Sequence, residues 1–218
     1  MIKIVCISDT HEAELEPEMF PDGDILVHAG DLTYRGTIDS VTAAAKQLGK
    51  LRNKFERIIA IPGNHDFLFE KEPVLARKIM EEHGIDLLIN ESLTTHGLKF
   101  WGSPTCPPFG RWAFYKNDKE REELWNSIPN DTDVVITHGP AEYILDEVEC
   151  INHMGYSLEH TGCEYLHKRL MELKPQLHVC GHIHEGYGKK LLNGTIFINA
   201  SYKDERYRPV NKPIVVEL

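Results

Sequence analysis

Long apolar runs are missing from this sequence, and their absence limits where the protein can function. No stretch of about 18 uninterrupted apolar residues occurs in the 218-residue chain, so we expect no transmembrane helix and no membrane partner. The chain opens with MIKIVCIS, a strand-like pattern that lacks the basic region and long apolar core of a secretory leader. The sequence therefore predicts a soluble, cytoplasmic protein.

Paired cysteines are missing as well. The five cysteines are odd in number and scattered, and none forms a Cys-x-x-Cys pair. This pattern argues against both a disulfide framework and a zinc ribbon, and it favours inert, buried thiols. The five are Cys6, Cys106, Cys150, Cys163 and Cys180.

Positive charge is also scarce. The chain has 34 acidic and 24 basic residues, which gives a formal net charge of −10. A protein that grips long nucleic acid needs many contacts from lysine and arginine to phosphate, so long nucleic acid is not an expected partner. A small anionic substrate still fits if bound metal ions concentrate positive charge locally.

What the sequence does contain is an alternation of strand and helix patterns. With 41% apolar residues and no repeat, linker or low-complexity segment, residues 1–218 are expected to form a single α/β domain. Five apolar runs predict buried strands at 2–8, 24–30, 57–63, 133–139 and 176–182. Helical patterns lie at about 38–54, 70–83, 117–127 and 161–173.

The later strands and one helix start have local signals of their own. Further strands are predicted at about 86–89, 93–101, 189–198 and 213–217. His96-Gly97 and Asn193-Gly194 are typical of hairpin turns. Thr161 followed by Glu164 has the spacing of a capping box, which predicts that Thr161 opens the last helix.

Each of the first five predicted strands is followed by polar residues of metal-binding types. Carboxyl ends of strands in an open α/β sheet border the crevice where ligands bind, so these residues are candidates for one shared site. His182 and His184 could lean toward the same face if the extended backbone continues through them. In chain order the five clusters are Asp9-Thr-His11, Gly30-Asp31, Gly63-Asn64-His65-Asp66, His138-Gly139 and Gly181-His182-Ile-His184.

In this order the clusters resemble the signature of the calcineurin-like metallophosphoesterases, which reads D-x-H, G-D, G-N-H-D/E, H and G-H-x-H. Segments such as IAIPGNHDF, FWGSPTCPPFGRWAF and VCGHIHEGYG extend the similarity to the branch of metallophosphoesterase-domain-containing proteins known from animal brain and from microbes. The resemblance implies a four-layer α-β-β-α sandwich of two mixed sheets, with metals held by loops at the strand ends.

The resemblance also implies a ligand set for two metal ions. Asp31 would bridge the two, while Asp9, His11 and His184 complete one metal and Asn64, His138 and His182 complete the other. Mixed imidazole and carboxylate ligands suit manganese, iron, zinc or cobalt. We expect manganese or an iron and manganese pair, in divalent or mixed-valence form, with zinc or cobalt as alternatives.

The implied function is a metal-dependent phosphodiesterase for small phosphodiesters such as cyclic nucleotides. A hydroxide bridging the metals would attack phosphorus, and His65 would stabilise the transition state or protonate the leaving oxygen. Asp31 and His65 are thus the expected catalytic residues. A phosphomonoesterase or nuclease on the same metals is an alternative, as is a nucleotide-binding or scaffold protein with low turnover. The oligomeric state is open, a homodimer included.

Two segments beside the motifs leave alternatives open. In 104–115, Phe109, Arg111 and Trp112 form either a wall that stacks a base and offers Arg111 to a phosphate or a hydrophobic loop packed on the sheet edge. We therefore list His65, Arg111 and Trp112 as candidate substrate-binding residues. Residues 202–209 favour a solvated loop, unless they fold over the crevice.

Two further polar residues also have competing interpretations. Asp66 could orient a metal-binding histidine or cap the following helix. His28 is interpreted as a hydrogen-bonded core histidine.

Overall fold

The first sheet contains the N-terminal strands. The computed structural model describes residues 1–108, 110–152 and 155–218. Five strands form this sheet, in the order β13-β1-β2-β3-β4. Strands β1 to β4 pair in parallel and β13 pairs antiparallel with β1, so the sheet is mixed. The bounds are β1 Lys3–Ile7, β2 Ile25–Ala29, β3 Arg57–Ile61, β4 Asp86–Leu87 and β13 Ile214–Glu217.

The second sheet has six strands in the order β11-β12-β10-β7-β6-β5. Its four central strands are parallel, while β5 and β11 pair antiparallel at the two edges. The bounds are β5 Glu91–Thr95, β6 Leu98–Ser103, β7 Val134–Thr137, β10 Leu177–Cys180, β11 Gly188–Leu192 and β12 Thr195–Asn199.

Side-chain alternation divides the interior into three apolar cores. In β1, Ile4 and Cys6 face the core between the two sheets, while Val5 and Ile7 face the core beneath the N-terminal helices. Because both faces of this strand are covered, it reads as a continuous apolar run. A third core, which includes Trp125, lies between the second sheet and its helices.

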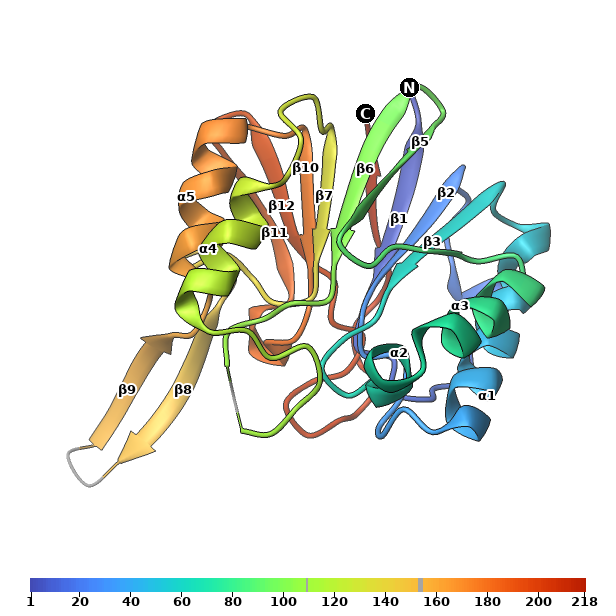
Figure 1. Ribbon diagram of the computed structural model, residues 1–218, viewed down its shortest axis with the longest axis horizontal. Coiled ribbons are helices and arrows are strands. Elements are labelled where there is room, and N and C mark those ends of the chain that lie inside the picture. The colour runs from blue at the N-terminus through green and yellow to red at the C-terminus, as the bar shows by residue number, and fades with distance from the viewer. Residues whose placement is uncertain (109, 153–154) are drawn as a thin grey trace.

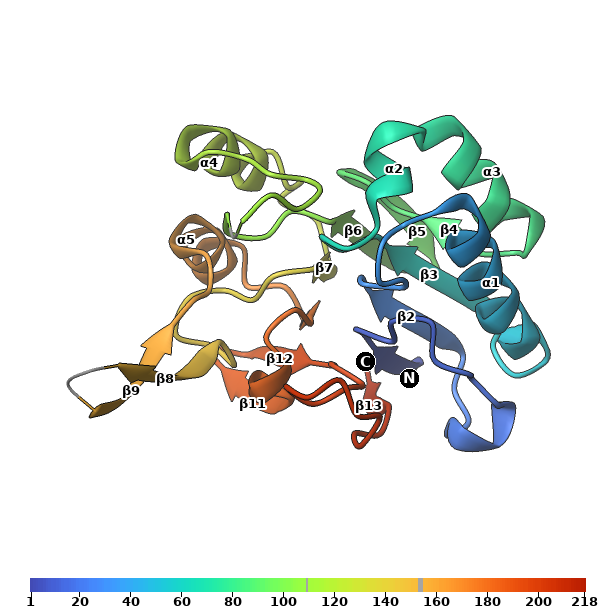
Figure 2. The same ribbon diagram turned by 90° about the horizontal axis from the view of Figure 1, so that it is seen from below.

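Helices cover the outer face of each sheet, and the predicted four-layer sandwich of two mixed sheets is confirmed (Figures 1 and 2). Helices α1 to α3 lie on the side of the first sheet, and α4 and α5 lie on the side of the second. The bounds are α1 Ile38–Gly49, α2 Phe67–Lys71, α3 Pro73–Glu82, α4 Asp118–Asn126 and α5 Glu164–Leu173. Short 3-10 helices occupy η1 Pro17–Met19, η2 Lys50–Asn53 and η3 His184–Gly186.

Two helix predictions need correction. The helix expected at 70–83 is two helices, α2 and α3, which meet at Glu72. Pro73 starts the second helix and disfavours helical backbone at the residue before it. The capping box is also wrong: α5 is preceded by Cys163, and the Thr161 hydroxyl donates to the Asp146 carbonyl instead.

A two-stranded sheet, β8 Glu147–Asn152 with β9 Gly155–His160, was not predicted. Each strand alternates only briefly, with Val148 and Cys150 in β8 and Tyr156 and Leu158 in β9, and such short patterns in a polar stretch are a weak signal. In Figure 1 this β8–β9 hairpin extends away from the sandwich, on the side of α4 and α5. Among the described residues, no helix combines the length and apolar character needed to cross a membrane.

Candidate metal centre

The predicted site residues lie in the loops that follow β1, β2, β3, β7 and β10, at one edge of the sandwich. The backbone there turns sharply. Asp9, His11, Asp31 and His182 all have positive φ, at 53°, 42°, 55° and 67°. This region is sparsely populated by non-glycine residues, and such strain is typical of functional sites.

Glycines let these loops approach one another closely. A Cβ added at Gly63 would lie 2.2 Å from Asp31 Oδ1, and one added at Gly181 would lie 2.1 Å from Asp9 Oδ2. Any other residue at these two positions would displace a carboxylate. The glycines of the G-N-H-D and G-H-x-H motifs are therefore required by packing against the acidic side chains.

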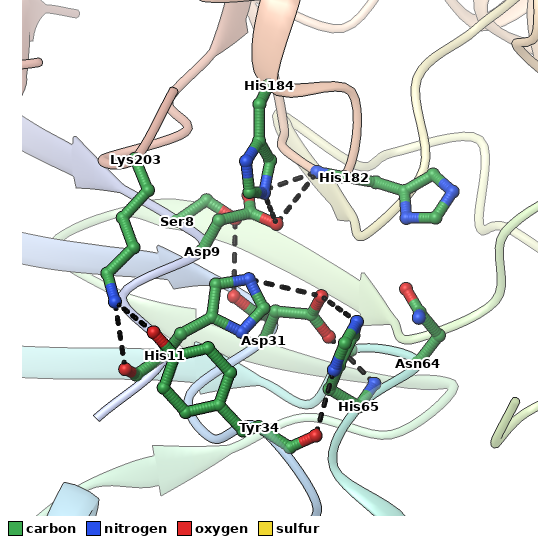
Figure 3. A network of polar contacts seen from close by, with 12 residues as sticks. Ser8, Asp9, His11, Asp31, Tyr34, Asn64, His65, His182, His184 and Lys203 are labelled. Carbon is green, nitrogen blue, oxygen red and sulfur yellow. Dashed lines mark hydrogen bonds and ion pairs between the residues drawn. The ribbon is translucent and has the colours of Figure 1, made fainter. Parts of the chain in front are cut away.

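Asp9, His11 and His184 form one half of the cluster. One ligand atom from each lies within 4.8 Å of the others, and all three side chains are buried. His184 Nε2 is 3.4 Å from Asp9 Oδ1 (Figure 3). The Ser201 hydroxyl lies 3.0 Å from Asp9 Oδ2. The structure thus brings together three residues that were predicted to bind the same metal.

Asp31 lies at the centre of the cluster. Its Oδ2 is 3.8 Å from the Nε2 atoms of both His11 and His65, and its Oδ1 is 3.4 Å from His138 Nε2. Asp31 and His138 also form a close group with Asp9. Asp31 therefore borders both halves of the cluster, as a bridging ligand must.

Four of the histidine rings are oriented by backbone carbonyls. The Nδ1 atoms of His11, His65, His138 and His184 lie 2.8 to 3.1 Å from the carbonyl oxygens of Thr33, Tyr34, Ala29 and Asp204, respectively. A carbonyl can only accept, so each Nδ1 carries the hydrogen, and in the neutral ring Nε2 presents a lone pair to the cluster. This is the arrangement by which metal-binding histidines are usually held.

His11 tests whether these residues fit a metal ion. Its Nε2 is buried and has no hydrogen-bond partner among the described residues, and it faces the Asp31 carboxylate. Burial, the dominant effect, lowers the pKa of His11 to about 4 despite the nearby Asp31 and Asp9. A lone pair facing a carboxylate oxygen cannot form a hydrogen bond, whereas both atoms can bind one cation. The donor set fits a transition-metal ion.

The protonation equilibria agree with this interpretation. Burial lowers the pKa of His138 and of His184, but the charges and hydrogen bonds of Asp31 and Asp9 outweigh it and raise both pKa values to about 9. Burial raises the pKa of Asp31, yet His138 and His11 bring it to about 2. The carboxylates of Asp31 and Asp9 thus favour positive charge at the His138 and His184 rings.

The other half of the cluster is less closely gathered. Asn64 Oδ1 is 2.9 Å from His138 Nε2, but the His182 ring points away from Asp9 and Asp31 in Figure 3. The ring lies against His138, with centroids 5.0 Å apart. The extended backbone does not continue through His182, because its φ is positive and a 3-10 helix begins at His184. His182 as a metal ligand stays a prediction.

His65 and Trp112 form the wall beside the cluster. Their ring centroids are 4.1 Å apart, and both residues line a cleft of about 520 Å³ that also reaches Asp31 and His184. Arg111 is exposed and is not among the described residues that line this cleft, so the geometry lends its predicted role no support. Phe109 lies outside the described residues.

Asp66 has neither of its two expected roles. Its carboxylate accepts hydrogen bonds from the backbone of Leu32, Thr33 and Gly63 and from the Thr33 hydroxyl, with no side-chain cap on α2. It therefore ties the loop carrying Asp31 to the loop carrying Asn64. Burial and the Asp31 charge raise the pKa of Asp66 to about 7, although the four donated hydrogen bonds favour the ionised form.

His28 conforms to its interpretation as a core histidine. The side chain is completely buried. Its Nε2 lies 2.9 Å from the Thr10 hydroxyl, and its Nδ1 lies 3.3 Å from the backbone nitrogen of Gly30. Both ring nitrogens therefore have partners outside the cluster.

The segment 201–209 contacts the site, which composition alone did not indicate. The Tyr207 ring lies 5.0 Å from the His11 ring and 5.1 Å from the His184 ring. Lys203 is buried, and its ammonium donates to the His11 carbonyl and to the Tyr34 hydroxyl. A β-bridge between Ser8 and Ser201 joins the strand ends of the two sheets and holds this segment beside the site. No local sequence pattern reveals that pairing.

Comparison with known proteins identifies the family. The family model of the calcineurin-like phosphoesterases matches residues 2–186. The chain belongs to the calcineurin-like phosphoesterase family. It is 36% identical to metallophosphoesterase domain-containing protein 1 of Homo sapiens, over 99% of this chain and 71% of that protein. A UPF0046 protein of Caenorhabditis elegans is 33% identical over 98% of this chain and 74% of its own length.

Solved structures agree on the fold. The crystal structure of TT1561 from Thermus thermophilus superposes with a TM-score of 0.63 at 15% identity, and the match covers 91% of this chain and 88% of that one. Such low identity supports the fold alone. Membership of the calcineurin-like phosphoesterases, together with the clustered aspartates and histidines, makes this chain a metal-dependent phosphoester hydrolase.

Proposed function

We propose that the protein is a phosphodiesterase that hydrolyses small phosphodiesters, such as cyclic nucleotides, with the help of two metal ions. The observation that carries the proposal is the inward orientation of the Nε2 atoms, each held by a carbonyl on Nδ1, toward Asp9 and Asp31. One ion would be held by Asp9, His11, Asp31 and His184, and the other by Asp31, Asn64, His138 and His182. Mixed nitrogen and oxygen donors favour manganese or an iron and manganese pair.

Two bound ions would neutralise charge on the phosphoryl group and supply a nucleophilic water at neutral pH. The Tyr34 backbone carbonyl accepts a hydrogen bond from His65 Nδ1. The proton that a protonated His65 could give up is therefore the one on Nε2, which faces the cluster. We assign to this atom the donation of a proton to the leaving oxygen, or of a hydrogen bond to a phosphoryl oxygen.

A diester is favoured over a monoester by the space beside the cluster. The cleft is lined by Asp31 and Trp112 and by residues of the β8–β9 hairpin, and its volume of about 520 Å³ is in the range of pockets that hold whole small molecules. The second ester group therefore has room. We propose a small phosphodiester or nucleotide as partner, in the cytoplasm, and with a net charge of −10 we do not propose long nucleic acid.

The proposal is tested by assaying bis(p-nitrophenyl) phosphate, p-nitrophenyl phosphate and cyclic nucleotides with chelated and manganese-reconstituted protein. We expect manganese-dependent cleavage of the diesters that exceeds cleavage of the monoester. Faster cleavage of the monoester would instead favour a phosphomonoesterase. Two bound metals without turnover of any substrate would favour a nucleotide-binding or scaffold role.

The role of His65 needs a separate measurement, because its Nε2 is as close to Asp31 as that of His11. If His65 acts on the substrate, His65→Ala retains both metals and loses activity. Loss of metal from this variant, measured by elemental analysis, would make His65 a ligand.

A further inference from the structure

Two chemically different groups of residues line the cleft beside the metal centre. Asp31, His65 and His184 belong to the centre itself, where the phosphate would bind. Glu159 of the β8–β9 hairpin, which extends away from the sandwich in Figure 1, and Glu185 of η3 also line the cleft. A substrate whose phosphorus lies at the cluster would therefore bring its remaining group near these two carboxylates.

Strand alternation directs one face of the hairpin into the cleft. Val148 is paired with Glu159, and Cys150 is paired with Ser157, so all four side chains lie on the same face. Three of them, Val148, Cys150 and Glu159, line the cleft. The opposite face includes Glu149, which accepts a hydrogen bond from the Tyr156 hydroxyl.

The base of the hairpin is fixed to the body of the protein. Buried Asp146 accepts hydrogen bonds from the backbone nitrogens of Tyr143 and Gly162 and from His160 Nδ1. An isolated two-stranded hairpin is marginally stable, so these bonds matter for its position. Because His160 directly follows Glu159 in β9, the anchored base also positions Glu159 relative to the cleft.

The two glutamates act on the same region. Strand β8 contacts η3, which contains Glu185. The pKa of Cys150 is raised, first by burial and then by the charge and hydrogen bonding of Glu159 and the charge of Glu185. No lysine or arginine is among the cleft-lining side chains in the part of the chain that the structure describes.

The two carboxylates limit which substrate groups can bind beside them. Recognition of a second phosphate or carboxylate requires cationic side chains, and here it would meet two carboxylates instead. Hydroxyl, amino and ammonium groups can donate to those carboxylates. Among the described lining residues, those of the metal centre are therefore the only ones that would attract an anion strongly.

We propose that Glu159 and Glu185 are specificity-determining residues. They select esters with a single negative charge whose group remote from the metals is cationic or rich in hydrogen-bond donors. They reject polyanions. This inference rests on the proposed phosphodiesterase function and adds the charge of the substrate to it.

The test uses three p-nitrophenyl phosphodiesters whose second substituent is trimethylammonioethyl, ethyl or carboxyethyl. These esters differ at the remote end in charge, from positive through neutral to negative. With the manganese-loaded protein we expect kcat/KM to fall in that order, by about 10-fold from the first to the last, because each exposed carboxylate contributes modestly. In 0.5 M salt the preference should shrink, since exposed charges are screened.

The double variant Glu159→Gln, Glu185→Gln should reduce this preference to about 2-fold, because it removes both carboxylates that favour the cationic ester. Glu149→Gln is the matched control, because it removes one charge from the outer face of the same hairpin, and it should keep the full preference. An unchanged preference in the double variant, or an equal loss in the control, would overturn the assignment.

Calorimetric titration of the same three esters separates this inference from the proposed function. If no ester is hydrolysed, the phosphodiesterase proposal fails. The dissociation constants of the three esters, compared with one another, then decide the charge preference. Affinities that rise from the carboxyethyl to the trimethylammonioethyl ester in the parent, and level out in the double variant, would support selection by the two glutamates. Equal affinities in the parent would overturn it.

Discussion

The two halves of the metal centre differ in how completely the protein arranges them. Asp9, His11 and His184 are buried, and one ligand atom from each lies within 4.8 Å of the others. Tyr207 packs against both histidine rings, and Lys203 of the same segment donates to the His11 carbonyl. Asn64 and His138 are in contact, but the His182 ring points away (Figure 3). The donor atoms of the first half already lie close together, whereas the predicted ligand His182 would have to rotate to join the second half. We therefore expect the first half to bind metal more tightly.

Asp31 borders both halves, so its substitution should have the largest effect. Asp31→Asn keeps the shape of the side chain but removes the charge that two bound ions would share. We expect kcat/KM for a diester to fall roughly 1,000-fold, as when charge stabilisation at a reacting centre is lost. The manganese content should fall as well.

Asp39→Asn is the matched control for this variant, because Asp39 is an exposed acid in the first turn of α1. We expect it to leave activity and metal content unchanged. Full activity of Asp31→Asn would exclude Asp31 as the bridge.

Single histidine deletions compare the halves directly. We expect His184→Ala to weaken manganese binding by roughly 100-fold, and His182→Ala by roughly 10-fold, since the second ring must give up its present position to bind. Both values come from titrating chelated protein with manganese in a calorimeter. Equal losses would show that the two halves are equally arranged before metal binds.

Gly63→Ala would add a methyl group between the loops that carry Gly63 and Asp31, and should disturb the centre without removing a ligand. The new Cβ of Gly63→Ala would lie 2.2 Å from Asp31 Oδ1 and 2.4 Å from the Asp31 backbone nitrogen. We expect the free energy of unfolding to drop by about 1–3 kcal/mol, as for other overpacked sites.

Gly49→Ala serves as the control in urea denaturation. Gly49 ends α1, and an added Cβ there would make only ordinary contacts, the nearest at 3.4 Å. Because alanine favours helix, this variant should be as stable as the parent or more so. Equal destabilisation of the two variants would contradict the role of close packing at Gly63.

The smallest effect is expected at the segment that covers the first half. Lys203→Met removes the hydrogen bonds from the ammonium to the His11 carbonyl and the Tyr34 hydroxyl. Loss of about 1 kcal/mol of positioning free energy corresponds to roughly 5-fold weaker manganese binding. Lys190→Met on the exposed edge strand β11 is the control. If both variants bind manganese alike, Lys203 does not support the first half.

The motifs could be found from sequence because each one is local. Asp9 and His11, or His182 and His184, lie within a few residues of an apolar strand that the pattern of side chains predicts. The turns at His96-Gly97 and Asn193-Gly194 were predicted for the same reason, and both have the positive φ values of such turns. The β8–β9 hairpin was missed because its apolar alternation is short and lies in a polar stretch, and the position of Tyr207 was missed because no local pattern identifies its neighbours.

The amino-acid sequence by itself determined the strands, the order of the motifs and the chemical types of the donors, because these depend on residues close together in the chain. Only the tertiary structure decided that His184 faces Asp9 while His182 turns away. It also decided that carbonyls distant in sequence orient the histidine rings, and that the hairpin brings Glu159 to the cleft. These features depend on backbone φ values and on contacts between distant segments, which the packing of the two sheets determines and local sequence does not.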